Sequence, residues 1–360
     1  MSKVRFSSKR LLLTLMLCAC SVILLQNYDI SQNSSFVFNL LCMLCGLAIC
    51  FALFVPSIII KKRTNLDFLT VAHTVTPKLK IPIAVLYSLY FVWAAEFFLL
   101  PYTDMFSKKY YSDVTPCLIA LILLSACVYA ALKGVNVITR FGIFLFVFAL
   151  LTNLLMFGGS TGTLDFELYG FEISGDLNDF IQNTVYFIIP AFIVTLFACL
   201  SGKTKNFKLR QPLFALLVTG VKYGLIMFFI WFSLGDYASK QEYQTFILAR
   251  AARIGFFGGI ESLYLALATM SVFMIISLVL CAVTKSAGKE SDIKYVVIFA
   301  VIIFAAHMCG SYLNSVKEIF TNNYIFAVFT VITAAVIPSM YIFAGRKSNA
   351  RKALHSINMS

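Results

Sequence analysis

Charged residues are scarce in this sequence. They make up 12% of the 360 residues, whereas roughly a quarter of the residues in an ordinary soluble domain are charged. Hydrophobic residues make up 60% of the chain, and the mean hydropathy is +0.88. This composition excludes an ordinary soluble protein and indicates a chain that lies in a membrane.

The sequence also lacks the residue patterns of common enzymes and metal sites. No loop carries a Ser/His/Asp set, a phosphate-binding glycine loop or a metal-ligand cluster, and loops of about 25 residues at most leave little room for a catalytic domain. Cys42 and Cys45 have the spacing of half a zinc or redox site, but neither a second such pair nor a nearby histidine completes it. We therefore predict no enzyme activity, cofactor, metal or structural disulfide, and interpret the cysteines as small buried residues.

Long apolar runs recur along the whole chain. Each can cross the roughly 30 Å of hydrocarbon in a bilayer, which takes about 17 to 25 residues. The first run follows basic residues like a secretory signal, but no convincing cleavage site comes after it, so we count it as a helix. The sequence predicts an all-α integral membrane protein with about ten transmembrane helices, near residues 11–27, 36–60, 81–101, 116–132, 141–158, 180–200, 212–235, 262–284, 295–311 and 323–345.

The distribution of basic residues indicates the topology. The formal net charge is +13, from 29 lysines and arginines against 16 acids. Of the 29, 22 fall in alternate segments that would face one side of the membrane, six fall on the other side, and Lys222 lies inside a run. Cytoplasmic loops carry such an excess. We therefore predict that both termini are cytoplasmic, that the chain's surroundings are the lipid bilayer, and that it binds no nucleic acid.

The predicted helices divide into two sets of five. Between the sets, residues 158–180 contain five acids and no lysine or arginine. Because five is odd, the two sets would run in opposite directions, as in the inverted repeats of many secondary transporters; a ten-helix channel or scaffold would share this parity. The predicted units are a first transmembrane repeat (1–160), an acidic outer loop (161–179), a second repeat (180–346) and a basic cytoplasmic tail (347–360).

Helices 1 and 6 are the predicted location of a binding site, because inverted-repeat transporters bind substrate at mid-membrane around interrupted helices. Helix 1 contains a run of small residues at 18–21, and helix 6 contains Pro190. Proline lacks a backbone donor and frees a carbonyl, so it favours an interruption. A plain proline kink is the alternative interpretation.

Ionisable side chains inside the predicted spans are further candidates. Lys222 lies roughly 16 Å into helix 7, where an ammonium needs a cavity or a partner. It would hold a substrate carboxylate, replace a coupling cation or pair with an acid; the alternative is a lysine that snorkels to the surface. Glu96 lies near the predicted outer end of helix 3, too far from Lys222 to pair with it unless that helix continues to Met105, and it either lines an outer vestibule or is interfacial. We interpret His307 as a hydrogen-bonded packing residue rather than a proton relay.

The segment from 247 to 261 combines two arginines, a glycine pair and an acid. Apolar and small residues from 247 to 258 follow helical spacing while Arg250 and Arg253 share another face, which predicts a short helix on the outer membrane surface. Glu261 then lies in the first turn of helix 8, where the helix dipole favours an acid by roughly 0.3 to 1 kcal/mol. We assign Glu261 a structural role with Arg250 or Arg253 as partner; a lid over an outer vestibule is the alternative.

Three stretches resemble one family of membrane proteins. EYQTFILARAARIGFFGGIESLYLALATMSVFMIISLVLCAV at 242–283 resembles the loop and eighth helix of the endospore germination permeases. GVNVITRFGIFLFVFALLTNLLMFG at 134–158 resembles their fifth helix, with Arg140 at the matching arginine, and LLPYTDMF at 99–106 resembles the end of their third. These permeases are the B subunits of spore nutrient germinant receptors in the amino acid/polyamine/organocation transporter superfamily. The resemblance implies a 5+5 inverted repeat of the amino acid transporter type.

The sequence departs from the family's pattern in several segments. Gln244 stands where proline is usual, Gly258 and Gly259 replace an acid and an arginine of a Glu-Arg-x-Glu motif, and Glu261 alone remains. Helix 1 has CACSVILL instead of a glycine-rich break, and helix 6 has IPAFIV where a glycine and a glutamate are common. These differences indicate a divergent member of the family.

The resemblance implies a membrane subunit of a germinant receptor, in the spore inner membrane or the bacterial cell membrane. Such a subunit binds a small nutrient, for which an amino acid is the expected class, and triggers germination with A-type and lipoprotein C-type subunits. The alternative is an autonomous secondary transporter of an amino acid or amine, coupled to a proton or sodium ion. The expected substrate-binding residues are Ala19, Cys20, Ser21, Glu96, Phe192, Ile193, Val194, Thr195 and Lys222, and the expected outer-gate or structural residues are Arg140, Arg250, Arg253 and Glu261.

Overall fold

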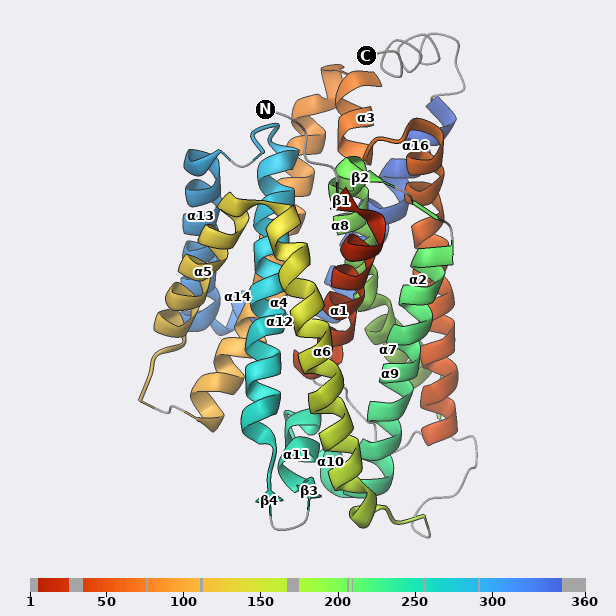
Figure 1. The fold of residues 1–360 in the computed structure, drawn as a ribbon, viewed down its shortest axis with the longest axis vertical. Helices are drawn as coiled ribbons and strands as arrows, with labels where there is room; N and C mark the ends of the chain where they lie inside the picture. Colours follow the sequence, from red (N-terminus) through yellow and green to blue (C-terminus); the bar gives the residue numbers. More distant parts are fainter. Residues whose placement is uncertain are drawn as a thin grey trace.

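The computed structural model describes residues 6–25, 35–75, 77–110, 113–166, 175–205, 207–208, 210–254, 257–290 and 292–344. The basic residues before position 6, the middle of the acidic loop at 167–174 and the predicted tail at 347–360 lie outside these ranges. Nearly all the described residues are helical, so the chain is an all-α protein (Figure 1).

The secondary-structure elements follow the predicted spans closely. The first half of the chain contains β1 (Phe6–Ser7), α1 (Ser8–Leu25), α2 (Phe36–Thr64), α3 (Phe68–Val75), η1 (Pro77–Leu79), α4 (Lys80–Lys109), α5 (Pro116–Lys133), α6 (Val135–Ser160) and η2 (Thr161–Thr163). The second half contains α7 (Leu177–Ile188), η3 (Ile189–Ala191), α8 (Phe192–Leu200), η4 (Ser201–Lys203), β2 (Thr204–Lys205), α9 (Arg210–Leu234), α10 (Asp236–Ser239), α11 (Gln244–Ala251), β3 (Arg253–Ile254), β4 (Phe257–Gly258), α12 (Glu261–Ser286), α13 (Ile293–Tyr312), α14 (Asn314–Phe320), α15 (Asn323–Val331), the π-helical turn η5 (Ile332–Val336) and α16 (Ile337–Ala344).

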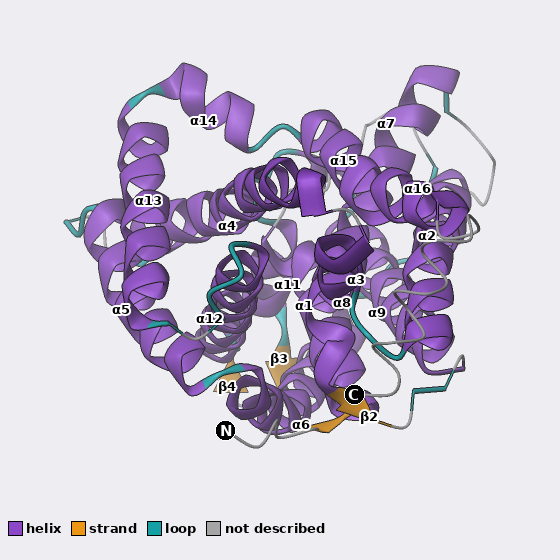
Figure 2. Ribbon diagram, turned by 90° about the horizontal axis from the view of Figure 1, so that it is seen from above, coloured by secondary structure: helices purple, strands orange, loops and turns teal. Residues whose placement is uncertain are grey.

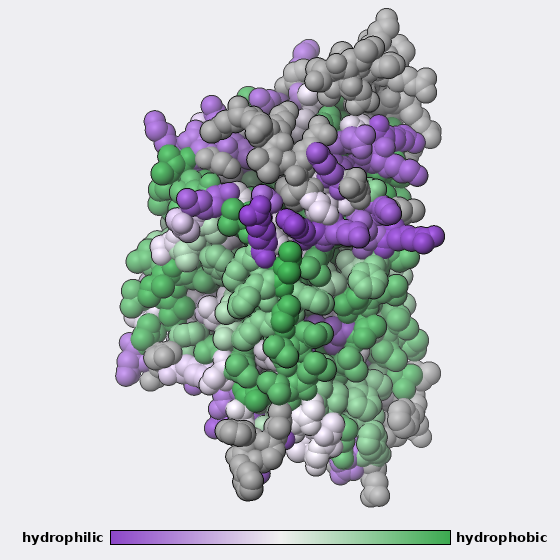
Figure 3. Space-filling view, viewed as in Figure 1, coloured by the Kyte–Doolittle hydropathy of each residue, from purple (hydrophilic) through white to green (hydrophobic). Residues whose placement is uncertain are grey.

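Ten helical segments in the described part of the chain are long and apolar enough to cross a membrane, which confirms the ten predicted spans. Three of these spans, namely α1, α7 with α8, and α12, are largely buried and form the interior of the bundle (Figure 2). The other spans surround them and carry the exposed aliphatic side chains. Figure 3 shows the result as a hydrophobic belt between two hydrophilic rims.

Local sequence signals define several helix ends. Ser35 caps α2, because its hydroxyl accepts a hydrogen bond from the Phe38 amide at 3.2 Å, and Asn65 ends the same helix in the left-handed conformation. Gly134 joins α5 to α6 with a φ of 86°, which glycine adopts without strain. Two short sheets complete the fold: β1 pairs with β2 in parallel, and β3 pairs with β4 in an antiparallel hairpin.

The two ends of the bundle differ in charge. The end at which α1 begins also holds α3 and the last turn of α16 (Figure 1), and most of the lysines and arginines counted above lie in its segments. We call it the basic end. The opposite end holds α10, α11 and the β3–β4 hairpin (Figure 1), and we call it the far end.

Three sequence-based expectations about helix limits are wrong. The third span continues to Lys109 instead of ending near 101, because Tyr102, Thr103 and Met105 are buried and hold the helix together beyond Pro101. The fifth span begins at Val135, earlier in the chain than the predicted start at 141. The helix predicted through 258 ends at Ala251, and the β3–β4 hairpin follows because the backbone of Ala252 is extended.

The two predicted interruptions have different outcomes. The first span is a continuous α-helix from Ser8 to Leu25, so residues 18–21 do not interrupt it. The sixth span is interrupted as expected: α7 ends at Ile188, and the 3₁₀ turn η3, which contains Pro190, separates it from α8. The tenth span is also irregular, because the π-helical turn η5 separates α15 from α16, and such turns are frequent at functional sites.

Candidate functional site

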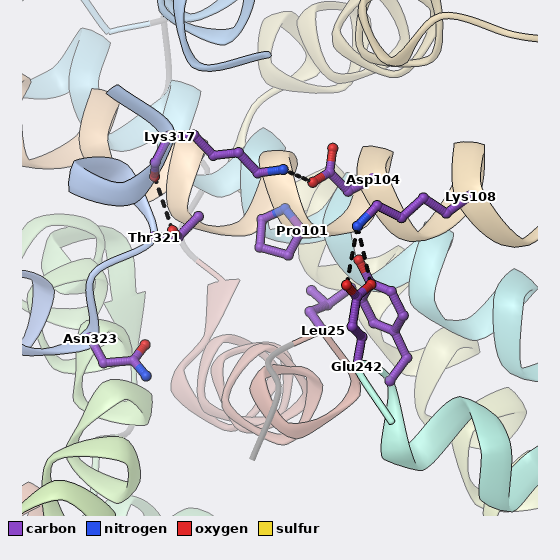
Figure 4. A pocket seen from close by; sticks show the side chains of 9 residues that line it. Leu25, Pro101, Asp104, Lys108, Glu242, Lys317, Thr321 and Asn323 are labelled. Atoms are coloured by element: carbon purple, nitrogen blue, oxygen red, sulfur yellow. Dashed lines mark hydrogen bonds and ion pairs between the residues drawn. The ribbon is translucent and has the colours of Figure 1, made fainter. Parts of the chain in front are cut away.

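A polar cavity of about 310 Å³ opens at the far end of the bundle. We call it the far-end vestibule; its lining comes from the ends of α1, α4, α14 and α15 and from the segment before α11, and comprises Leu25, Pro101, Asp104, Lys108, Glu242, Tyr243, Lys317, Thr321 and Asn323. Figure 4 shows its four charged side chains, two acidic and two basic, in two ion pairs. The vestibule therefore has no formal net charge.

Both ion pairs of the vestibule use α4. Asp104 and Lys108 lie four residues apart and so share one face of that helix. Lys108 contacts Glu242 at 3.1 Å, with side chains 50% and 58% exposed, and Lys317 pairs with Asp104. Burial and the nearby carboxylates of Asp104 and Glu242 raise the pKa of the Tyr243 phenol, so this hydroxyl is a neutral hydrogen-bonding group. A pair as exposed as Lys108–Glu242 contributes little to stability, and water or a solute can replace either of its partners.

A layer of phenylalanine rings lies one helical turn below the vestibule. Phe98 is three residues deeper than Pro101 on α4, and Phe326 is three residues deeper than Asn323 on α15. The Phe97 and Phe326 rings stack with centroids 4.0 Å apart, and the Phe98 and Phe192 centroids are 4.7 Å apart. We call Phe97, Phe98, Phe192 and Phe326 the aromatic layer. All four are fully buried, so they close the floor of the vestibule.

Below the aromatic layer, deeper in the bundle, the side chains that meet carry hydroxyl groups. Thr195 of α8 and Thr333 of η5 lie with their hydroxyl oxygens 3.1 Å apart, and Tyr90 of α4 bonds with Thr330 at 3.0 Å. Tyr87 donates to the backbone carbonyl of Thr333 at 2.6 Å. We call these five residues the hydroxyl layer. They are buried and join three spans around the two irregular helices, where backbone groups are less completely paired.

The interruption of the sixth span follows from its proline. Pro190 cannot donate a backbone hydrogen bond, and Cys50 of α2 contacts the carbonyl oxygens of Phe187 and Ile188 at 3.5 and 3.8 Å. Phe192 and Thr195, both in the first turn of α8, lie in the aromatic and hydroxyl layers. The interruption therefore lies directly before residues 192–195, the predicted ligand-binding segment of helix 6.

The basic end is closed by buried charges. Lys285 at the end of α12 contacts Asp67 at 3.0 Å, and the two side chains are 12% and 3% exposed. Lys61, also buried, donates to the carbonyls of Asn65 and of Ser201 at the end of α8. We call Lys61, Asp67 and Lys285 the basic-end latch. Because it joins α2, α8 and α12, the latch holds the basic end closed while the far end is open to solvent.

The predicted residues of helix 1 lie beside those of helix 6. Contacts join α1 to both η3 and α8, and Ala19, Cys20 and Ser21 are buried. Their polar groups are already engaged: Tyr223 donates to the Ala19 carbonyl at 2.7 Å, and the Ser21 hydroxyl donates to Leu17 one turn back. The structure thus brings the two predicted segments together, and Ile193 and Val194 of α8 are buried as well.

Glu96 and Lys222 do not meet. Since α4 continues to Lys109, Glu96 lies near the middle of its helix and not near the outer end as expected. Its Oε2 contacts His307 Nδ1 at 3.1 Å, both side chains are fully buried, and Glu96 Oε1 has no partner. The lysine contacts the Cys20 carbonyl at 3.1 Å instead.

The comparisons with known proteins agree with this architecture. The sequence model of the family described as "Spore germination protein" matches residues 3–319 of the 360. The chain belongs to the spore germination protein family. No curated protein matches the sequence.

One solved structure shows the fold of this germination protein. The crystal structure of MhsT in complex with L-phenylalanine superposes on 99% of this chain and 99% of its own chain, with a TM-score of 0.51 and 14% sequence identity. The chain therefore has the inverted-repeat fold of the amino acid transporter type, as the sequence predicted.

The remaining predicted residues of the germination protein lie near its surface. Arg140 on α6 and Arg250 on α11 are exposed, as is Arg253 in β3. Glu261 is the first residue of α12, as predicted, but no ion pair among the described residues joins it to either arginine, and its Oε2 is buried without a partner. Burial and the Glu261 carboxylate raise the pKa of Tyr110 to about 12, while Arg250 acts in the opposite direction.

Sequence reasoning missed the charged residues of the vestibule and the latch. Lys108, Lys285 and Lys317 entered only the count of basic residues, and no sequence pattern singled out Asp67. The available signal was the helical spacing of Asp104 and Lys108. Which distant residue completes each pair depends on the packing of the bundle.

Proposed function

We propose that this germination protein binds a small zwitterionic nutrient, an amino acid, between its aromatic and hydroxyl layers. Membership of the germination protein family supports a role in the response of spores to nutrients. The fold it shares with MhsT, which was crystallised with L-phenylalanine, supports an amino acid as the ligand class. The far-end vestibule supports the route of entry, because its balanced charges suit a molecule that carries one positive and one negative group.

The observation that carries the proposal is the interruption of the sixth span at Pro190. Half-helices at mid-membrane offer backbone groups and helix ends to a polar ligand that would otherwise lose its hydration. In the first turn of α8, directly after the interruption, Phe192 offers an aromatic surface and Thr195 a hydroxyl group. A ligand between them would meet both apolar and hydrogen-bonding groups, as in most small-molecule sites.

Binding would act by shifting the population between two arrangements of the bundle. The described arrangement is closed by the basic-end latch and open at the vestibule. A ligand that binds one arrangement more tightly than the other raises the population of that arrangement. The ratio of its affinities for the two arrangements limits the shift in their equilibrium. In the proposed role, A-type and lipoprotein C-type subunits detect this change. The protein lies in the spore inner membrane, and its far end faces away from the cytoplasm.

The test is direct binding by the purified protein. We would measure the thermal unfolding midpoint of the full chain in lipid nanodiscs with each of the common L-amino acids, L-phenylalanine included. A ligand at a hundred times its Kd stabilises the folded state by about 2.7 kcal/mol, which is readily measured. The Phe192→Ala variant should lose this stabilisation, whereas Phe214→Ala, which removes an exposed ring on α9, should keep it.

Two results would decide against the proposal. If no amino acid changes the midpoint of the unaltered protein, this ligand class is wrong. If Phe192→Ala and Phe214→Ala respond alike, the site lies elsewhere.

Coupled transport is the second candidate, because the chain has the fold of the amino acid transporter type over its whole length. Proteoliposomes that contain only this chain would distinguish the two functions. Accumulation of labelled amino acid against its gradient, driven by a proton or sodium gradient, would establish transport. Binding without accumulation would favour the receptor role.

A further inference from the structure

The outer surface of the bundle carries a groove between α6 and α9, with α1 as its floor. Its volume is about 230 Å³, and its lining is apolar except for two side chains, Lys222 of α9 and Asn153 of α6. Leu150 and Leu154 form the α6 side of the groove and are more than half exposed. Figure 3 shows a hydrophilic patch within the hydrophobic belt between these two helices. The groove therefore faces the lipid and contains a charge.

Lys222 lies at the middle of the membrane. It is twelve residues from Arg210 and twelve from Leu234, the two ends of α9, which places it about 18 Å from each end at the α-helical rise. A lysine stem spans about 6 Å and does not reach either rim from this depth. The ammonium group thus stays in the hydrocarbon region of the bilayer.

The polar groups in the groove have unused hydrogen-bonding capacity. An ammonium has three donors, and Lys222 makes one described hydrogen bond, to the Cys20 carbonyl at 3.1 Å. The Asn153 amide nitrogen donates to Ala149 at 2.6 Å, and its side-chain oxygen enters no hydrogen bond among the described residues. Lipid chains offer no acceptor to such donors. A transmembrane helix that brings an acceptor, ideally a carboxylate, would satisfy both the charge and the apolar walls.

The described residues of a second copy of this chain offer no carboxylate to this groove. Among the described residues, Glu96 is the one acidic residue near the middle of a membrane-spanning helix, and its side chain is fully buried against His307. The other acids of the described chain lie in loops or toward helix ends. A carboxylate at this depth would therefore come from a different protein.

We propose that the groove between α6 and α9 is the docking site for a transmembrane helix of a partner subunit, which places an aspartate or glutamate against Lys222. The inference rests on the proposed function for the existence of a partner and extends it by locating the contact. Leu150 and Leu154 would pack against the partner helix, and Asn153 would hydrogen-bond to it.

Photo-crosslinking in native membranes tests the site. Benzoylphenylalanine replaces Leu154 in the groove or, as a control, Val301 on α13; both native side chains are 60% exposed. The expected product at position 154 is a crosslink to a transmembrane helix of a different protein that contains an aspartate or glutamate. Position 301 should not give this product. A crosslink from 154 to lipid alone or to a second copy of this chain would overturn the proposal, as would the same partner at equal yield from 301.

Charge exchange tests the role of the lysine. The Lys222→Met variant should recover about tenfold less of the crosslinked partner during affinity purification, while Lys222→Arg retains the cation and the partner. Lys222→Glu together with lysine in place of the partner's acid should restore recovery. Unchanged recovery with Lys222→Met, or no restoration by the exchanged pair, would show that the ion pair does not form.

A groove-filling variant separates this inference from the proposed function. Leu154→Trp should lose the partner, Val301→Trp should keep it, and both should bind amino acid like the unaltered protein because neither residue lies in the aromatic or hydroxyl layer. Partner recovery unaffected by Leu154→Trp would refute docking in the groove. Failure of the unaltered protein to bind amino acids would refute the proposed ligand and leave the crosslinking result to be judged by itself.

Discussion

The basic-end latch gives the sharpest prediction about the conformational equilibrium. Lys285→Met removes the cation from Asp67 and keeps a side chain of similar length. Asp67 is 3% exposed, so its carboxylate would lose its charged partner while it stays out of water. Two hydrogen bonds remain, because the Thr70 hydroxyl and amide both donate to the carboxylate, at 2.9 and 3.2 Å. We therefore expect an incomplete but substantial loss of stabilisation.

The magnitude follows from the burial of this pair. Removal of one partner from a buried ion pair destabilises the folded state by roughly 3 to 5 kcal/mol, and the two Thr70 bonds favour the lower value. About 3 kcal/mol corresponds to a factor of about 100 in an equilibrium constant. Opening of the basic end should be favoured by up to that factor in Lys285→Met, since the Lys285–Asp67 pair of the latch joins the end of α12 to the start of α3.

Alkylation of a buried cysteine reports this opening. Cys199 of α8 is fully buried and lies close to both Asp67 and Lys285. We expect maleimide to modify Cys199 much faster in Lys285→Met than in the unaltered protein in detergent, as measured by peptide mass spectrometry. Lys289→Met is the matched control, because it removes the same charge from an exposed position.

The reasoning would be refuted by equal behaviour of the two variants. If Cys199 reacts at the same rate in Lys285→Met and Lys289→Met, and the unfolding midpoints also agree, the buried pair does not hold the basic end closed. Asp67→Asn and the double variant complete a mutant cycle that measures the coupling between the two side chains.

Two further predictions concern packing and the buried acid. Gly46→Ala should destabilise the protein by about 1 to 3 kcal/mol in a thermal unfolding assay, because the new methyl carbon would lie 2.4 Å from Phe187 Cβ. Gly158→Ala is the control: its methyl group meets nothing within 4 Å, so it should be neutral or stabilising in the same assay. His307→Leu should destabilise by about 1 to 3 kcal/mol, because it leaves the buried Glu96 side chain without its hydrogen-bond partner, and replacement of Glu96 by Met in the same chain should recover most of that loss. A double variant as unstable as the sum of its single changes would contradict the second prediction.

The spans could be predicted from the sequence because a bilayer restricts the choice. A backbone in hydrocarbon must satisfy its own hydrogen bonds, so an apolar run of sufficient length becomes a helix whatever its neighbours are. Ten such runs and their alternating loop charges indicated an inverted repeat, and the family resemblance pointed to the amino acid transporter type. The proline at 190 favoured an interruption of the sixth span, and a plain kink was the alternative.

The candidate site was predictable only in part. Phe192 and Thr195 could be located from the proline beside them. The depth of Glu96 could not, because burial of side chains beyond Pro101 extends the third span by two turns. No local pattern distinguishes His307 as its partner.

The sequence by itself determined the membrane, the number of spans and their two-fold organisation, because hydropathy and loop charge depend on residues that are close together in the chain. Only the tertiary structure decided which ionisable side chains meet: Asp67 with Lys285, Asp104 with Lys317 and Glu96 with His307. Each of these pairs joins segments that are far apart in the sequence. The packing of the helices, not the order of the residues, brings them within the few ångströms at which a charge finds its partner.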